Sequence, residues 1–480
     1  MDWATLKAQV ASGKFAGITS DSREVAPGFL FVAVSGTSQD GHLYIPEVRK
    51  KGAQIVVGER AGADIVVKDS RQALAELAAD FYGNPAQTMS LAAVTGTSGK
   101  TTTTYILESI LEAAGEKAGV IGTVNFRFGE KIYPSTHTTP GAVELQKLLA
   151  EMKSDGCTHV VMEVSSHALK QYRVGAIPFD VMAFTNLTPE HLDYHPDIED
   201  YFNSKAMLFR DFFELSEKVG KRPSCVVNAD DPHGRRLLGE LTASHPARPE
   251  SVRAFSPGMA SLQESLTGIS GTVADLQIHS RLMGRFNLYN LLCAIEMARS
   301  LGIAKAAIEN GVSRLPGVPG RMESIANSRG IHVFVDYAHK SDAFEKVLIN
   351  LKALKRPSQR LITVFGCGGD RDAQKRPVMG RLAVEHSDEV IVTWDNPRTE
   401  DPTAITDAIV AGIRGFTGKT PLTPYRVEPD RKKAIETAIG MARPGDLVLI
   451  AGKGHEDYQI LGKTKVHFDD REVARQALIS

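Results

Sequence analysis

The sequence predicts an α/β protein in three parts, and three observations support this fold class. Short apolar runs alternate with amphipathic stretches along most of the chain. Clusters of turn-forming residues at 82–88 and at 316–321 divide it. The 480 residues also exceed what one hydrophobic core normally holds. We therefore expect a small α/β domain over residues 1–88, a central domain over 89–316 with a mainly parallel sheet, and a third α/β domain over 317–480.

The composition is that of a soluble globular protein. Hydrophobic residues make up 42% and charged residues 24%, and the net charge is −1. This balance gives no support for a nucleic-acid or membrane partner. No apolar stretch approaches the roughly 18–20 residues of a spanning helix, and the N-terminus lacks an apolar signal core. We expect a cytoplasmic monomer whose scattered cysteines are reduced thiols, namely Cys157, Cys225, Cys293 and Cys367.

The first 88 residues contain apolar runs typical of strands and one amphipathic helix. The strands are expected at 29–34, 54–57 and 65–67, and the helix at 71–81. The loops at 19–23 and 35–41 are rich in hydroxyl and amide side chains. Such loops are either ordinary turns or binding sites for a sugar or a nucleotide diphosphate.

The most informative motif is a glycine-rich turn at residues 96–101. An apolar run at 91–94 predicts a buried strand before it, and helical spacing from 102 to 114 follows it. Such a turn presents backbone N–H groups and a helix N-terminus to a polyphosphate. Lys100 would meet the β- and γ-phosphates, and the Thr101 hydroxyl a Mg²⁺ ion. Val94 stands where the full P-loop pattern has glycine, so the match is to the shorter form Gly-x-x-Gly-Lys-Thr.

Further strands are expected in the central domain at 159–164, 180–185 and 224–228, with polar residues at their ends. Residues 245–280 look like an irregular antiparallel excursion, and 286–301 like a helix carrying Asn290. Glu163 ends one strand, where a carboxylate commonly completes the Mg²⁺ shell of a P-loop domain. His191 and His195 have the i, i+4 spacing of a zinc pair, but no Cys or Glu completes such a site nearby.

Lys205 lies among apolar residues at helical spacing. It can extend its ammonium group to solvent. Alternatively, burial can depress its pKa, and the neutral amine can then form a carbamate with CO₂. Composition alone favours the first alternative.

The third domain has expected strands at 332–336, 361–365, 389–393 and 446–451. Arg321 follows the Pro-Gly turn at its start, where it can reach phosphates, and Arg371 and Arg398 lie on loops after two strands. Each can equally be a solvated surface arginine. Arginine also binds carboxylates in bidentate fashion. With Glu456 on a third loop, these residues suit a ligand with carboxylate and ammonium groups, such as an amino acid.

Eight motifs in order along nearly the whole chain closely resemble those of the ATP-dependent Mur ligases of peptidoglycan synthesis. They begin at Val94, Glu163, Thr185, Asn228, Gly284, Pro319, Asp336 and Gly452. The resemblance implies an N-terminal UDP-binding domain, a central ATPase domain and a C-terminal Rossmann-like domain that brings in an amino acid. It also implies that ATP activates a carboxylate as an acyl phosphate, which the incoming amine attacks.

The resemblance also implies roles for individual residues. Lys100, Lys205 and His191 would be catalytic. Thr101, Glu163 and His191 would surround Mg²⁺. Lys205, as a carbamate (N6-carboxylysine), would position a second Mg²⁺, which reverses the judgement from composition. ATP would contact Gly96, Thr97, Ser98, Gly99, Lys100, Thr101, Thr102, Asn290, Arg321 and Asp336. The UDP-MurNAc-dipeptide would contact Ser20, Ser22, Thr37, Ser38, Gln39, Thr138, Thr139, Ser165, Gln171 and Arg173.

Within the family, Asp395-Asn-Pro-Arg398 resembles the motif of members that add meso-2,6-diaminopimelate as the third residue of the stem peptide. Lysine-adding members lack this arginine. Diaminopimelate carries one more carboxylate than lysine, and a site built to pair that group loses strongly when it is absent. The implied pocket consists of Arg371, Asp395, Asn396, Arg398, Gly452 and Glu456.

The chain departs from the family pattern at three places. Thr37-Ser-Gln39 replaces His-Gln-Ala, Pro189-Glu190 replaces Arg-Asp, and Lys340-Ser341 replaces Thr-Pro. The first departure puts the uridine diphosphate contacts of that loop in doubt. Three alternatives stay open: a lysine-adding ligase, a ligase similar to folylpolyglutamate synthase, and, from another class, a P-loop regulatory ATPase. The arginine motif and the hydroxyl-rich first domain argue against the two other ligases, and the regulatory ATPase leaves Arg371, Arg398 and Glu456 unexplained.

Overall fold

The structure, a computed structural model, describes residues 1–36, 39–135 and 137–479. The chain forms two compact units. One consists of Met1–Ala260 and Tyr289–Val312, and the other of Ser261–Leu288 and Ser313–Ser480. The three domain ranges expected from the sequence stay a prediction.

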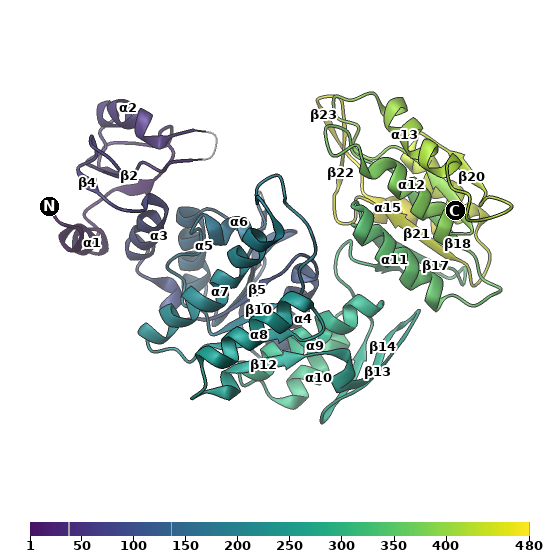
Figure 1. The fold of residues 1–480 in the computed structure, drawn as a ribbon, viewed down its shortest axis with the longest axis horizontal. Helices are drawn as coiled ribbons and strands as arrows, with labels where there is room; N and C mark the ends of the chain where they lie inside the picture. The colour runs from purple at the N-terminus through teal and green to yellow at the C-terminus, as the bar shows by residue number, and fades with distance from the viewer. Residues whose placement is uncertain (37–38, 136, 480) are drawn as a thin grey trace. The chain divides into compact units, whose positions relative to one another are not determined.

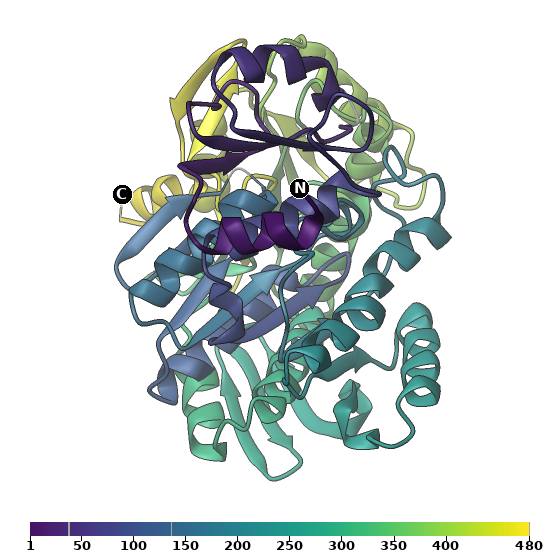
Figure 2. The ribbon, with the colours of Figure 1, turned by 90° about the vertical axis from the view of Figure 1, so that its left-hand side faces the viewer.

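The N-terminal part is a four-stranded parallel sheet with short helices (Figures 1 and 2). Its strands, in sheet order, are β1 (Gly17–Thr19), β2 (Phe29–Val32), β3 (Ile55–Gly58) and β4 (Ile65–Val66). The helices are α1 (Trp3–Ala11), α2 (Ile45–Lys50) and α3 (Ser70–Phe81). Leu6 and Val10 of α1 pack into the same core as Leu30 of β2. Asp69 begins α3 by accepting two backbone N–H groups, as an N-cap does.

The central sheet has eight strands. Their order is β12-β11-β10-β5-β9-β6-β7-β8. All pairs from β12 to β6 are parallel, and β7 and β8 continue the sheet antiparallel. The bounds are β5 (Ser90–Thr95), β6 (Ala118–Ile121), β7 (Asn125–Phe128), β8 (Lys131–Pro134), β9 (His159–Glu163), β10 (Val181–Phe184), β11 (Ser224–Asn228) and β12 (Val252–Phe255).

Helices pack on this sheet, which explains why its inner strands are apolar without alternation. Residues 181–184 of β10, for example, are all buried. The helices are α4 (Lys100–Ala113), α5 (Ala142–Ser154), α6 (Ser166–Lys170), α7 (Ile198–Lys218), α8 (Pro232–Ser244), α9 (Arg285–Ser300) and α10 (Lys305–Arg314). Because parallel strands place their carboxyl ends at one edge, the polar residues after β5, β9 and β10 converge there.

The second unit contains a six-stranded sheet with helices on both faces (Figure 1). Its order is β16 (Glu323–Ile325), β17 (His332–Asp336), β21 (Leu447–Ala451), β18 (Leu361–Phe365), β19 (Glu389–Val392) and β20 (Tyr425–Val427). β16 is antiparallel and the others are parallel. One face packs on α11 (Ser341–Leu354), α12 (Lys375–His386) and α13 (Pro402–Arg414), and the other on α14 (Arg431–Met441) and α15 (Asp470–Ile479).

Two small sheets complete this unit. One consists of β13 (Ala260–Ser265), β14 (Gly268–Val273) and β15 (Leu276–Ser280), and the other is the hairpin of β22 (Tyr458–Leu461) and β23 (Thr464–His467). The expected α/β fold with mainly parallel sheets is confirmed. One detail differs: the expected antiparallel excursion at 245–280 contains β12, which joins the central sheet parallel to β11.

Candidate functional site

The glycine-rich turn that is expected to bind phosphates lies between β5 and α4, as the sequence predicts. Gly96 and Gly99 have φ angles of 141° and 90°, which favour glycine. A side chain at either would also collide with a neighbour, Thr185 Oγ1 at Gly96 and Asn290 Oδ1 at Gly99. The end of β10 braces the turn, because Asn186 accepts hydrogen bonds from the backbone N–H groups of Thr97 (2.9 Å) and Ser98 (3.0 Å). Asn290, an expected ATP contact, therefore lies directly against the turn.

Two lysines donate hydrogen bonds to one carbonyl of this turn. Lys100 Nζ donates to Gly96 O at 2.8 Å and to Thr97 O at 3.0 Å. Lys205 Nζ, on α7, donates to Gly96 O at 2.9 Å. Lys205 is only 1% exposed and does not extend to solvent. Burial, and next the charge of Lys100, lower the pKa of Lys205 well below its usual value. This is the condition for a neutral, nucleophilic amine.

Glu163 is the buried carboxylate beside the turn. Its Oε1 accepts hydrogen bonds from Thr101 Oγ1 (3.0 Å) and from the N–H of Thr123 (2.9 Å), and Oε2 accepts from Thr123 Oγ1 (2.9 Å). The Thr101 hydroxyl and this carboxylate are the hard oxygen donors that Mg²⁺ prefers, so the donor set fits that ion. Thr123, which the sequence does not single out, follows β6 and orients the carboxylate. The only indication that Thr123 lies near Glu163 is that their strands, β6 and β9, pair in the sheet.

His191, which is expected near Mg²⁺, and His195 have separate environments. His191 has a φ of 57°, and its side chain is 43% exposed. Desolvation, then Lys100 and Lys205, lower its pKa. His195 is fully buried, with Nδ1 2.6 Å from Asp200 Oδ2 and Nε2 3.0 Å from Ser166 Oγ. It therefore anchors the loop rather than forming a zinc pair, and among the described residues no cluster of three or more His, Cys, Asp or Glu suits a metal.

The residues expected to hold the dipeptide form one connected group next to Glu163. Thr139 Oγ1 donates to Glu163 O at 2.9 Å and accepts from the N–H of Ser165 at 3.1 Å. Arg173 donates to Thr139 O at 2.9 Å and to Gln171 Oε1 at 2.8 Å. Thr138 Oγ1 lies 3.1 Å from Thr123 Oγ1 and so connects this group to the carboxylate.

A wall of aromatic rings adjoins this group and was not predicted. Gln171 donates to the Tyr194 hydroxyl at 3.2 Å. The Tyr194 ring stacks on His167 at 4.1 Å, and the His167 ring meets that of His191 edge-on at 5.0 Å. Burial, and then the charges of His191 and His195, lower the pKa of His167 to about 4. A neutral imidazole thus lies between the expected dipeptide and metal residues.

The N-terminal candidates lie on loops of the first sheet. Ser20 and Ser22 follow β1, in a turn fixed by a hydrogen bond of 2.8 Å from Thr19 Oγ1 to Glu24. Gln39 Oε1 accepts from the Tyr44 hydroxyl at 3.2 Å. Thr37 and Ser38 lie outside the described residues, so the expected uridine diphosphate contacts of that loop stay a prediction.

In the second unit, Asp336 ends β17 and holds the loop that carries Arg321. Its carboxylate accepts the N–H groups of Met322 (2.7 Å) and Ala338 (2.8 Å). The Arg321 guanidinium lies 4.7 Å from the centre of the Tyr337 ring. Its buried Nε has no hydrogen-bond partner within the described part of the chain. A polar ligand group would satisfy this donor, which fits the expected contact with ATP.

The expected amino-acid residues lie on neighbouring loops of the same sheet. Asp395 and Asn396 are buried after β19, and Asn396 Nδ2 donates to Glu456 Oε2 at 3.0 Å. Arg398, with a φ of 53°, donates through Nη1 to Gly369 O at 2.8 Å. A side chain at Gly452 would lie 3.0 Å from Asp395 Oδ2, so glycine lets that carboxylate approach the turn. Arg371 is exposed and bonds to Asp370 O at 3.0 Å.

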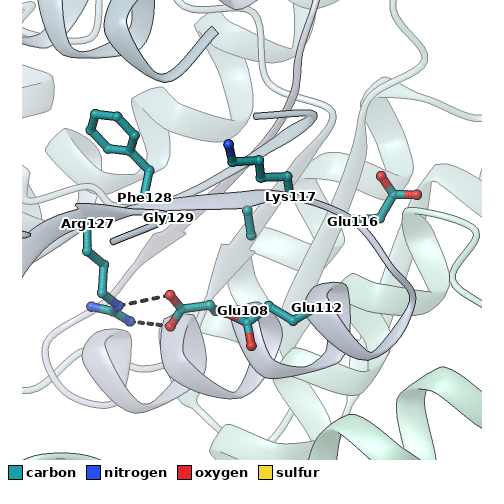
Figure 3. Close-up of a pocket in the computed structure, with 8 residues that line it drawn as sticks. Glu108, Glu112, Glu116, Lys117, Arg127, Phe128 and Gly129 are labelled. Carbon is teal, nitrogen blue, oxygen red and sulfur yellow. Dashed lines mark hydrogen bonds and ion pairs between the residues drawn. The ribbon is translucent and has the colours of Figure 1, made fainter. Parts of the chain in front are cut away.

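A separate pocket of about 160 Å³ lies at the far end of α4 from Lys100 (Figure 3). The Arg127 guanidinium forms an ion pair there with Glu108 and lies 3.9 Å from the centre of the Tyr105 ring. None of the eight lining residues is a predicted site residue. The structure therefore gives this pocket no part in the candidate site.

Comparison with known proteins covers all three parts of the chain. Residues 14–82 match the Mur ligase family catalytic domain, 94–298 the Mur ligase middle domain, and 320–454 the Mur ligase glutamate ligase domain. The chain is 46% identical to the UDP-N-acetylmuramoyl-L-alanyl-D-glutamate--2,6-diaminopimelate ligase of Geobacter metallireducens, over 95% of this chain and 92% of that one.

Solved structures show the same similarity. A structure of a UDP-N-acetylmuramoyl-L-alanyl-D-glutamate--2,6-diaminopimelate ligase matches with a TM-score of 0.71 and 32% identity, over 97% of this chain and 95% of that chain. The MurF ligase of Thermotoga maritima in complex with ADP shares the fold, with a TM-score of 0.57 and 20% identity over 98% and 97% of the two chains. No helix in the described ranges is long and apolar enough to cross a membrane.

Proposed function

The chain belongs to the Mur ligase family, and we propose on this basis that it is an ATP-dependent ligase that adds meso-2,6-diaminopimelate to UDP-N-acetylmuramoyl-L-alanyl-D-glutamate in peptidoglycan synthesis. The observation that carries this proposal is the loop of Asp395, Asn396 and Arg398 beside Glu456, on a chain 46% identical to a ligase of that name. We further propose that the protein acts in the cytoplasm as a monomer.

The proposed reaction has two steps. The γ-carboxylate oxygen of the D-glutamyl residue attacks the γ-phosphorus of ATP, which gives an acyl phosphate and releases ADP. The substrate amine then attacks the acyl carbon and loses a proton, and phosphate leaves as the amide forms. ATP thus replaces a poor leaving group with a good one. ADP in the Thermotoga maritima relative is consistent with this use of nucleotide.

The residues of the first unit would bind the phosphoryl donor and the acceptor carboxylate. Backbone N–H groups of residues 96–102 would bind the phosphates, and Lys100 would move from Gly96 O to neutralise charge on the transferred group. Thr101, Glu163 and His191 would hold Mg²⁺, which supplies further positive charge there when bound. The neighbouring Thr138, Thr139, Ser165, Gln171 and Arg173 would fix the dipeptide.

Lys205 has a separate proposed role. Its buried amine would, in the neutral form, attack CO₂ and lose a proton to give a carbamate, and the new carboxylate would position a second Mg²⁺. The carbamate carries a negative charge that the neutral amine lacks, and this charge attracts the cation. Arg321 and Asp336 would also contact ATP.

The amino acid would be selected by charge. Arg398 and Arg371 would pair with a carboxylate, while Asp395, Asn396 and Glu456 would bind an ammonium group. Lysine lacks the distal carboxylate, so it would leave an arginine in the pocket unpaired.

The test is release of phosphate by the purified full chain with ATP, Mg²⁺ and UDP-MurNAc-dipeptide. It compares diaminopimelate, lysine and no amino acid. Release with diaminopimelate alone is expected. Equal release with lysine would contradict the selectivity, and release that does not need the dipeptide would indicate a regulatory ATPase instead.

A further inference from the structure

Lys453 is a lysine buried beside the candidate amino-acid pocket. It follows β21, between Gly452 and Gly454, and its side chain is 0% exposed. A lysine is almost never fully buried unless its ammonium group is paired. The groups that pair with it therefore indicate its purpose.

Its three partners are all residues of the candidate pocket. Nζ lies 3.4 Å from Asp395 Oδ1, 3.2 Å from Asn396 Oδ1 and 3.3 Å from Glu456 Oε2. An ammonium group has three N–H donors, so these three acceptors satisfy it. The partners come from two loops, one after β19 and one after β21, and Lys453 connects the loops.

The lysine also fixes the orientation of the Asn396 amide. Asn396 Oδ1 faces Lys453 and the N–H of Ile460 (3.0 Å), while Nδ2 donates to Glu456 Oε2 at 3.0 Å. Because the amide oxygen and the amide nitrogen each have their own partners, the amide cannot flip without losing hydrogen bonds.

We propose that Lys453 is the positioning residue of the amino-acid pocket: it holds Asp395, Asn396 and Glu456 in one arrangement and reduces the charge of the two carboxylates from −2 to −1. One net negative charge suits one ammonium group of the incoming amino acid. Without the lysine, two carboxylates would face each other in a buried site, and one would take up a proton. This inference rests on the proposed function.

Other titratable groups near Glu456 come from several neighbouring elements. They are Asp395 after β19, Tyr337 after β17, Tyr458 on β22, and Arg431 of α14, which is paired with Asp470 of α15. Burial raises the pKa of Glu456; the Lys453 ammonium opposes this rise and Asp395 adds to it. Lys453 is the cation that donates a hydrogen bond to Glu456, at 3.3 Å.

The experiment compares steady-state kinetics of the full chain with those of Lys453→Met. The KM for diaminopimelate should rise about tenfold or more, because the ammonium group that donates hydrogen bonds to Asp395, Asn396 and Glu456 is lost. The KM values for ATP and for UDP-MurNAc-dipeptide should stay unchanged. The acidic limb of kcat/KM for diaminopimelate should move to higher pH, because Glu456 would bind a proton more readily. Lys453→Arg, which keeps the charge, should recover part of the loss.

The matched control is Lys463→Met, which removes an exposed lysine from the turn between β22 and β23 and should change nothing. If Lys453→Met does not fold, Lys453→Gln provides the same comparison with a neutral donor. An unchanged KM and pH profile in a folded variant would overturn the proposal, as would an equal loss for all three substrates. If the unaltered chain itself showed no release that depends on diaminopimelate, the proposed function would fail instead.

Discussion

Replacement of Arg398 tests whether the pocket recognises the distal carboxylate. Its side chain donates through Nη1 to Gly369 O at 2.8 Å, and no other guanidinium nitrogen of Arg398 has a hydrogen bond within the described ranges. A guanidinium has five N–H donors, so enough remain for a bidentate contact with a carboxylate. In Arg398→Met, diaminopimelate would lose this contact, whereas lysine has no group to lose.

The expected size follows from the charged hydrogen bonds. Such a bond contributes about 1.5–3 kcal/mol, which corresponds to a decrease of about 10- to 150-fold in kcat/KM for diaminopimelate. The value for lysine should change by less than about threefold. The rate of phosphate release at a subsaturating concentration of each amino acid measures both kcat/KM values.

A control separates recognition from folding. Arg381→Met removes an exposed arginine of α12 that pairs with Glu385 four residues on, and it should leave both values unchanged. The reasoning would be refuted if Arg398→Met lowered kcat/KM equally for diaminopimelate and lysine, or if it lowered neither in a folded protein.

Four further results are expected. Lys205→Ala should lose activity that high bicarbonate does not restore, because no amine remains to form the carbamate; near-normal turnover would remove the carbamate from the mechanism. Thr123→Val should raise the Mg²⁺ concentration for half-maximal activity by about 10- to 100-fold, since Thr123 orients Glu163; an unchanged Mg²⁺ requirement would argue against that role. Asp200→Asn should lower the free energy of unfolding in urea by about 1–3 kcal/mol, because it weakens the anchor of the buried His195; equal urea midpoints for the two proteins would contradict this. The stability in urea should also decrease as the pH falls from about 6.5 towards 4, because the folded state holds the pKa of His167 at about 4 and the unfolded state binds the proton first; His167→Gln should reduce this dependence, and an identical pH profile would count against it.

The sequence predicts most inner strands well because their physical signal is strong, although the short buried strand β6 was not predicted. The expected ranges 224–228, 332–336 and 361–365 agree with β11, β17 and β18 residue for residue. These strands are buried on both faces, so their apolar runs are continuous and end sharply at polar residues. The antiparallel strands β7 and β8, at one end of the central sheet, were not predicted. They are short, and β8 is exposed throughout, so no apolar run marks it.

The candidate site was predictable where chemistry requires a residue type in a local motif. The turn at Gly96–Thr101 and the loop at Asp395–Arg398 are of this kind. Residues that act through another residue were missed, because their partners are remote in sequence. Thr123 contacts Glu163 from 40 residues away, and Lys453 contacts Asp395 from 58 residues away. A lysine also reads as a surface residue until the fold buries it.

The central claim is that this chain joins diaminopimelate, and not lysine, to the dipeptide. In the most direct measurement, the full chain is incubated with ATP, Mg²⁺, UDP-MurNAc-dipeptide and equal concentrations of the two amino acids. The mass of the product is then determined. The two possible tripeptides differ by the mass of one CO₂. We predict that nearly all product carries diaminopimelate. Comparable amounts of the lysine product, or nucleotide hydrolysis without any tripeptide, would contradict the claim.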